Sequence, residues 1–237
     1  MGEGMMTDAA IMPFISSANI ACGYHAGNEE IMKKTVELAV KNDVAIGAHP
    51  GFADKKNFGR KELQLKISQY YQLIIDQLVA FKNITNALGV GIHHVKPHGA
   101  LYNMSAKNKS IASTIAKAVK DFDENLILYG LSGSYSISEA KAFHLKTASE
   151  VFADRTYQNN GSLTPRSQSS ALIEDENISL KQVLQMVQKH TVTSLENFTI
   201  SIVAETICIH GDGIYAVEFA KRIYETLSEK NIVIKAC

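Results

Sequence analysis

The sequence of 237 residues contains no tryptophan and few aromatic residues (8%), so it offers little surface for stacking nucleic-acid bases. Lysine plus arginine (24) balance aspartate plus glutamate (24), so no net positive charge attracts nucleic acid or an acidic membrane. No stretch approaches the roughly 18 consecutive apolar residues of a membrane span, and the N-terminal region lacks the pattern of a signal peptide. We therefore expect neither nucleic acid nor a membrane as a partner.

Cysteine is also scarce. Cys22, Cys208 and Cys237 form no CxxC pair, and an odd number is a poor framework for disulfides. A reduced, cytoplasmic setting is the simplest interpretation. There is no tandem repeat and no Pro- or Ser-rich linker, while 46% of the residues are apolar. This composition predicts one domain, residues 1–237, with a large core.

Short apolar runs alternate with segments of helical periodicity. The six runs are 17–25, 44–49, 92–98, 126–131, 146–152 and 206–210, and four of them end in histidine. The helical segments are 28–41, 68–88, 110–120, 134–143, 179–190 and 215–230, the first with Asn28 as its N-cap. Strands that alternate with helices at this spacing form parallel sheets, either as a barrel or as a doubly wound sheet.

Alternation within the runs favours the barrel. Counting back from His49, Gly47 and Ala45 share one face, whereas Ile46 and Val44 point to the other. A sheet covered by helices on both sides is expected to be apolar on both faces. One small, polar face and one apolar face fit a barrel with helices outside and a tight interior.

In such barrels, the reactive groups gather at the C-terminal ends of the strands. Here the strand ends supply ionisable side chains in five of the six runs. We expect catalysis from His25, His49, Lys96, His98, Glu150, His210 and Asp212. We expect substrate binding from Asn19, Asp154, Arg155 and Arg166.

Several of these residues also have a plain structural explanation. A single histidine at a strand end is often only a hydrogen bonder, but two on adjacent strands, His25 and His49, favour function. Lys96 faces the interior and must pair with a carboxylate or bind an anion, because an isolated buried ammonium is costly. Glu150 is either a general base or the partner of Lys96. His94 has the same inward parity but lies deeper, which favours a role in the core.

The segments near the C-terminus allow two interpretations each. Asp154 and Arg155 form either a functional pair or a structural ion pair. In His210-Gly-Asp-Gly213, Asp212 is either catalytic or the cap of the following helix. Residues 156–175 lack periodicity, and a loop this long is expected to be a lid that carries Arg166 over an anionic substrate. Imidazoles and carboxylates at strand ends can assemble a divalent metal site, although no HxxxH or HExxH spacing marks one.

Together, the motifs resemble the LamB/YcsF family nearly end to end. The strings that carry the likeness are SSANIACGYHAG (16–27), IGAHPGF (46–52), FGR (58–60), HVKPHGALY (94–102), EVFADR (150–155), LTPRS (163–167) and CIHGD (208–212). The resemblance implies a seven-stranded parallel β/α barrel of the glycoside hydrolase/deacetylase type. It also implies ATP-dependent opening of 5-oxo-L-proline to L-glutamate together with separate B and C subunits, with ATP used by or with those partners.

The likeness has two departures. Family members begin with a strand that precedes the Gly2-Glu3-Gly4 motif, so the first of the seven strands is expected to be missing here, which leaves unpaired edges on its neighbours. Ser170 also stands where glycine is expected.

Hydrolysis of an amide needs an activated water, a proton donor for the leaving nitrogen and stabilisation of the oxyanion. The hypothesis gives the first role to Glu150 or a histidine, the second to His98 or His25, and the third to Lys96. Arg155, Arg166 or Lys96 would bind the substrate carboxylate. The rival functions are a metal-dependent deacetylase acting on sugars, and a non-catalytic scaffold subunit.

Overall fold

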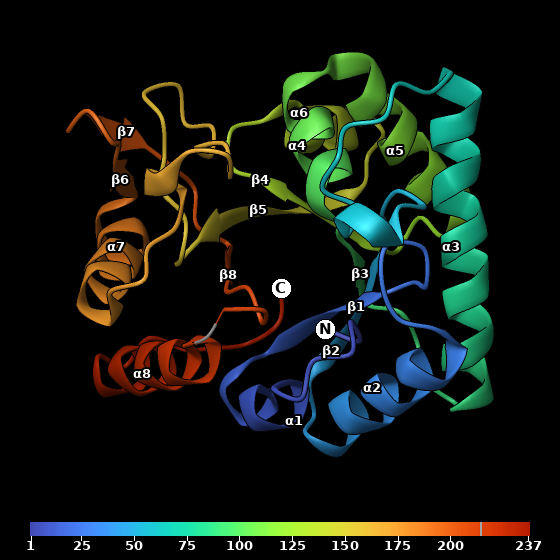
Figure 1. Cartoon of the computed structure of the whole chain (residues 1–237), viewed down its shortest axis with the longest axis horizontal. Helices are drawn as coiled ribbons and strands as arrows, with labels where there is room; N and C mark the ends of the chain where they lie inside the picture. The colour runs from blue at the N-terminus through green and yellow to red at the C-terminus, as the bar shows by residue number, and fades with distance from the viewer. Residues whose placement is uncertain (214) are drawn as a thin grey trace.

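The computed structural model describes residues 1–213 and 215–237 and contains a curled sheet of six parallel strands (Figure 1). Each strand pairs with its neighbour in the order β1-β2-β3-β4-β5-β8. The strands are β1 (Ser17–Ala21), β2 (Ala45–His49), β3 (His94–Val95), β4 (Ile127–Leu131), β5 (Lys146–Phe152) and β8 (Thr206–Cys208). All six expected strands are present, most of them shorter than the apolar runs that predicted them.

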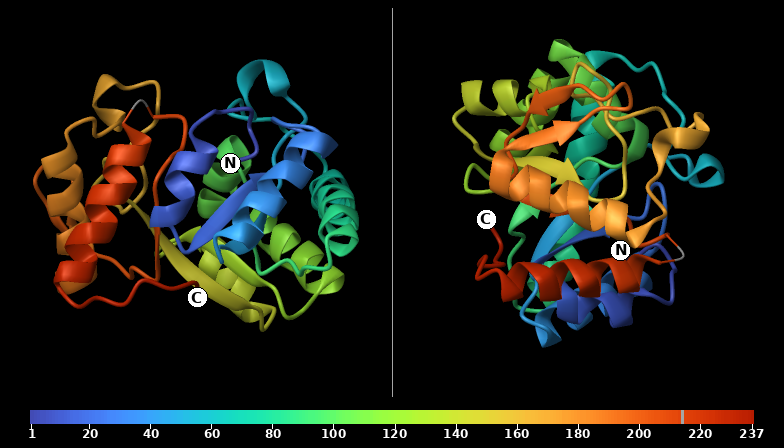
Figure 2. Two further views of the ribbon diagram at one scale, coloured as in Figure 1. Left: turned by 90° about the horizontal axis from the view of Figure 1, so that it is seen from below. Right: turned by 90° about the vertical axis from the view of Figure 1, so that its left-hand side faces the viewer.

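The helices lie around the outside of this curled sheet (Figures 1 and 2). They are α1 (Asp8–Ile11), α2 (Glu29–Lys41), α3 (Ile67–Ala87), α4 (Gly99–Lys107), α5 (Lys109–Phe122), α6 (Tyr135–Ala142), α7 (Glu176–Lys189) and α8 (Ala216–Glu229). Asn28 caps α2 as predicted, since its side chain accepts a hydrogen bond from the Ile31 amide. Asn108 and Asp175 cap α5 and α7 in the same way.

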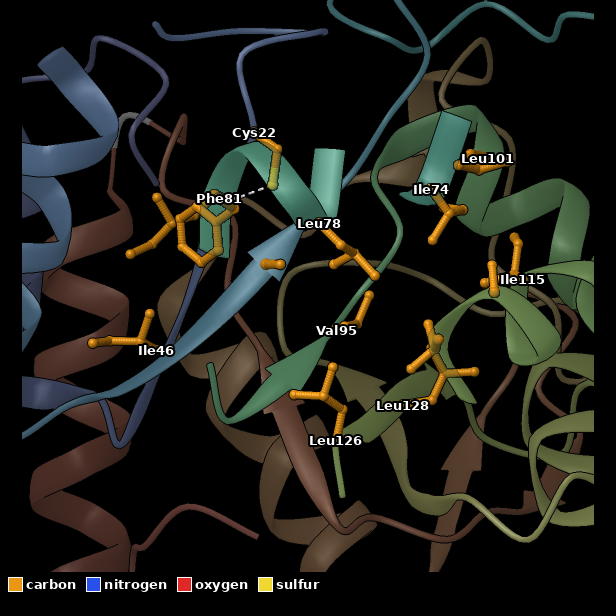
Figure 3. Close-up of a cluster of buried hydrophobic side chains, with 14 of the residues drawn as sticks. Cys22, Ile46, Ile74, Leu78, Phe81, Val95, Leu101, Ile115, Leu126 and Leu128 are labelled. Atoms are coloured by element: carbon orange, nitrogen blue, oxygen red, sulfur yellow. Dashed lines mark hydrogen bonds between the residues drawn. The ribbon is translucent and has the colours of Figure 1, made fainter. Parts of the chain in front are cut away.

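The main core lies between the sheet and these helices. Ile46, Val95 and Leu128 project outward from three adjacent strands and pack with residues of the surrounding helices, among them Leu78 and Ile115 (Figure 3). Asn19 and His49 lie on the opposite face of their strands, and their side chains line the interior of the curled sheet. The two faces predicted from the alternation are therefore present, and the polar face is the inner one.

Two helices and one hairpin were not predicted from the sequence. Helix α1 has four residues, too few to show a helical period. Helix α4 is buried on most sides, including Leu101, Tyr102 and Met104, so it lacks the polar face that gives helical periodicity. The antiparallel hairpin of β6 (Thr191–Thr193) and β7 (Thr199–Ser201) has strands of three residues, too short for a period-2 pattern.

Strands β1 and β8 form the two edges of the sheet. On the free side of β1, the Met1 amine donates to the Asn19 carbonyl at 2.9 Å, and the Ala21 amide donates to the Met1 carbonyl at 2.9 Å. The observed fold is thus a six-stranded half-barrel, and closure by a seventh strand stays a prediction. Across the described residues, we found no helix with the length and apolar character needed to span a membrane.

Candidate active site

A cavity of about 650 Å³ occupies the interior of the half-barrel. Nine of the eleven predicted site residues line it: Asn19, His49, Lys96, His98, Glu150, Arg155, Arg166, His210 and Asp212. The other two, His25 and Asp154, lie directly behind lining residues, as the contacts below establish. Side chains from strands distant in the sequence thus converge, because parallel strands present their C-terminal ends at one edge.

Lys96 and Glu150 form a buried ion pair at the centre of the wall. The Lys96 Nζ lies 2.7 Å from Glu150 Oε1 and donates to Cys208 Sγ at 3.1 Å. Lys96 is 5% exposed and Glu150 is 1% exposed. Burial alone would lower the pKa of Lys96, but the neighbouring Cys208 and Glu150 outweigh it and raise the pKa above its usual value. The ammonium is therefore charged at neutral pH and has access to the cavity.

A cluster of histidines lies beside this pair. The rings of His25 and His98 stack with centroids 3.7 Å apart, and His98 Nδ1 lies 2.9 Å from His49 Nε2. His25 Nε2 is 3.3 Å from Glu3 Oε1. Burial would raise the pKa of Glu3, but the hydrogen bond with His25 and nearby positive charge lower the pKa to about 2. The cluster therefore contains an ionised carboxylate.

Glycine allows the chain to close over these rings. Gly59 has a φ of +62°, and a Cβ there would lie 2.8 Å from the Cβ of His25 and 3.0 Å from Cδ2 of His98. Both the left-handed backbone and the contact exclude a larger side chain without displacement of the stacked rings. This explains the glycine of the Phe-Gly-Arg motif.

His210 is held by a carboxylate. Its Nδ1 lies 2.9 Å from each oxygen of Asp154, and its backbone amide donates to Asp154 Oδ2 at 2.9 Å. Burial would raise the pKa of Asp154, but the contacts with His210 lower it to about 2. An ionised Asp154 accepts from Nδ1–H, which leaves the Nε2 lone pair of a neutral His210 as a base.

The rim of the cavity carries two arginines. Arg60 Nη2 donates to Asp212 Oδ2 at 2.5 Å. The hydrogen bond with Arg60 lowers the pKa of Asp212 although burial opposes it. Arg166, on the loop after β5, is exposed. Asp212 thus pairs with Arg60 instead of capping α8.

Arg155 lines the cavity and is hydrogen-bonded to the loop that follows it. Its Nε donates to the Ala171 carbonyl at 3.1 Å, and its Nη2 donates to the Thr164 carbonyl. The side chain is buried. These contacts, together with the bridge between Arg155 and Leu172, anchor the long loop expected to act as a lid.

His94 lies deeper, below the histidine cluster. Its Nε2 is 3.0 Å from Asn19 Oδ1, its ring stacks on Tyr129 at 4.1 Å, and it is fully buried. Burial, together with the charges of His93 and Lys96, lowers its pKa well below 6.5. Asn19, expected to bind substrate, therefore has a partner already in His94.

The buried His94 predicts a loss of stability in acid. The unfolded chain takes up this proton near pH 6.5 while the folded protein does not, so the stabilisation is complete above pH 6.5 and falls below it. At pH 5 the loss attributable to His94 is about 2 kcal/mol. Urea unfolding of wild type and His94→Phe at several pH values between 7 and 5 measures this loss. The free energy of unfolding should fall less with pH in the variant than in the wild type. An equal fall in both would show that His94 is protonated in the folded state.

Four residues of the site were not identified from the sequence: Glu3, Arg60, Tyr102 and Cys208. Glu3 and Arg60 lie in the Gly-Glu-Gly and Phe-Gly-Arg motifs but not at strand ends. Cys208 is two residues before His210 and so faces the same inner side of the sheet, a pattern from which its place in the site could have been predicted. Tyr102 belongs to α4, and its ring lies 5.5 Å from Lys96 Nζ.

The fold and the cavity define an α/β protein with a curled parallel sheet and a buried acid–base cluster at its strand ends. The chain belongs to the LamB/YcsF family, whose model matches residues 1–237. It is 50% identical to the A subunit of 5-oxoprolinase from Tolumonas auensis (100% of this chain, 96% of the relative). It is also 50% identical to that of Staphylococcus aureus strain bovine RF122 (97% and 92%).

A solved structure has the same fold. The lactam utilization protein from Thermus thermophilus superposes with a TM-score of 0.93 at 36% identity, covering 100% of this chain and 97% of that one. The predicted family likeness is thereby confirmed, and the parallel α/β architecture agrees with that structure.

Proposed function

We propose that this chain is the A subunit of an ATP-dependent, multi-subunit 5-oxoprolinase and opens the ring of 5-oxo-L-proline to give L-glutamate. The relatives named as A subunits of 5-oxoprolinase and the lactam utilization protein support a cyclic amide as the substrate. The word subunit in those names supports an assembly, and we assign ATP use to the B and C subunits or to their complex with this chain.

The observation that carries the proposal is that a buried cation, Lys96, and a carboxylate-held imidazole, His210, line one cavity. Water attacks the lactam carbonyl and His210 Nε2 takes its proton. The Lys96 ammonium stabilises the oxyanion in a site where low dielectric strengthens the interaction. The carbon–nitrogen bond then breaks, and His210 gives the proton to the leaving nitrogen.

The remaining predicted residues have supporting roles in this scheme. In the proposed scheme, Arg166 binds the substrate carboxylate at the rim together with Arg60. Asp154 orients His210, and Arg155 anchors the loop that carries Arg166. Glu150 keeps Lys96 charged and in place.

The test is an assay of glutamate released from 5-oxoproline by the chain alone and with the B and C subunits and ATP. We expect release only from the complete mixture, and none when Lys96→Ala replaces the wild-type chain. Normal turnover with Lys96→Ala would indicate a scaffold role instead. Release of acetate from acetylated sugars by the chain alone would indicate a deacetylase.

A further inference from the structure

The protonation of His49 is determined by the backbone. Its Nδ1 lies 2.6 Å from the Lys96 carbonyl oxygen. A carbonyl only accepts hydrogen bonds, so Nδ1 carries the proton and donates. In the neutral ring, the other nitrogen, Nε2, then has a free lone pair that points toward His98.

His98 is fixed in the opposite sense. Its Nε2 lies 2.8 Å from the Phe58 carbonyl oxygen, so Nε2 carries the proton and Nδ1 has the lone pair. The two lone pairs, on His49 Nε2 and His98 Nδ1, thus face each other at 2.9 Å. Two acceptors cannot form a hydrogen bond with each other. The pair needs a cation between them, either an added proton or a metal ion.

A carboxylate completes the arrangement. Glu3 Oε1 lies 3.9 Å from His98 Nδ1, and ligand atoms of Glu3, His49 and His98 all lie within 4.8 Å of one another. Bonds of 2.0–2.1 Å from one ion place two tetrahedral nitrogens about 3.3 Å apart. The observed pair therefore needs to open by only about 0.4 Å to hold such an ion.

The surroundings of these ligands also match a metal site. In protein metal sites, a ligating histidine donates its second N–H to a carbonyl or carboxylate, which fixes its orientation. Both His49 and His98 do so, to Lys96 and Phe58. Glu3 is fixed in turn by His25. Three protein ligands leave a fourth position toward the cavity, as in catalytic zinc sites.

We propose that Glu3, His49 and His98 bind one first-row divalent transition-metal ion. Two imidazoles and one carboxylate suit Zn²⁺, Co²⁺ or Ni²⁺ better than Mg²⁺ or Ca²⁺, which favour oxygen ligands only. Binding of the ion is independent of the substrate. Its role rests on the proposed lactam hydrolysis: the ion would carry the attacking water and ease loss of its proton to His210.

The experiment uses untagged, chelator-treated protein and the metal alone. Calorimetric titration with Zn²⁺ is expected to give one ion per chain, and Co²⁺ is expected to give the visible absorption of a four-coordinate site. His49→Gln and His98→Gln are expected to abolish binding. Glu3→Gln is expected to lower the metal affinity more than replacement of a residue that only supports a ligand does, which typically costs roughly 10–100-fold. His190→Asn, at the exposed end of α7, is the matched histidine control and should bind normally.

Circular dichroism of each variant establishes that it is folded. Absence of stoichiometric binding to the wild-type protein would overturn the proposal, as would NMR showing His98 doubly protonated in the presence of Zn²⁺. Equal affinity of Glu3→Gln and wild type would remove Glu3 from the site. Stoichiometric binding to the chain, with no glutamate released by the metal-loaded chain in the complete mixture with the B and C subunits and ATP, would support the metal site while rejecting the proposed function. Full turnover of 5-oxoproline by the assembly with a metal-free A chain would reject the catalytic role of the ion at this site.

Discussion

Replacement of Lys96 by methionine is expected to destabilise the protein by about 3–5 kcal/mol, because it leaves the carboxylate of Glu150 buried without its partner. Glu150 is 1% exposed, so its carboxylate has little contact with solvent to replace the ammonium. Glu150→Gln is expected to be destabilising for the converse reason. Urea unfolding at neutral pH measures both losses as free energies of unfolding.

The double variant Lys96→Met, Glu150→Leu separates stability from function. Buried ion pairs are often replaced by apolar residues at little cost, since the desolvation of both charges is removed. We expect the double variant to recover most of the lost stability and none of the turnover. The exposed pair of Lys34 and Glu30 in α2 is the matched control, and Lys34→Met should change stability little. A cost for Lys96→Met as small as that of the control would mean that water solvates Glu150.

Asp154→Asn is expected to lower kcat by about 10³–10⁴-fold with a smaller change in KM, because it places the His210 proton on the wrong nitrogen. The His210 amide donates to one oxygen of Asp154, so it would hold the asparagine carbonyl oxygen at that position. The asparagine NH₂ would then face Nδ1 of His210 and donate to it. The proton moves to Nε2, and the imidazole can no longer act as a base toward the cavity.

Steady-state kinetics of the assembly with 5-oxoproline and ATP would measure this loss. Combining Asp154→Asn with His210→Gln should cost little more than His210→Gln alone, since the two residues act as one unit. Asp212→Asn is the matched comparison at the rim, where loss of the Arg60 contact is expected to act mainly on KM. A fall in kcat of less than tenfold for Asp154→Asn would show that His210 needs no orienting carboxylate. If the losses of Asp154→Asn and His210→Gln simply added in the double variant, the two residues would have separate roles.

The sequence was sufficient to predict the class of fold. The alternation of apolar runs with helical segments reflects the local periods of strand and helix, and it predicted all six parallel strands and the helices α2, α3, α5, α6, α7 and α8. Strand parity also placed Asn19, His49, Lys96 and Glu150 on the inner face, because successive residues of a strand point to opposite sides. Helix α4 was missed for the same physical reason, since a helix buried on most sides has no polar face.

Pairing across the interior was decided by the tertiary structure. Lys96 required a carboxylate on energetic grounds, yet only the curvature of the sheet brings Glu150, two strands away, to 2.7 Å. Asp154 lies 2.9 Å from the ring of His210, a pairing that no local pattern predicts, and Glu3 reaches the histidines from outside the strands. Local sequence determines which way each side chain points. Which groups meet depends on how the chain folds back on itself. Such contacts join residues far apart in the sequence, and no local period encodes them.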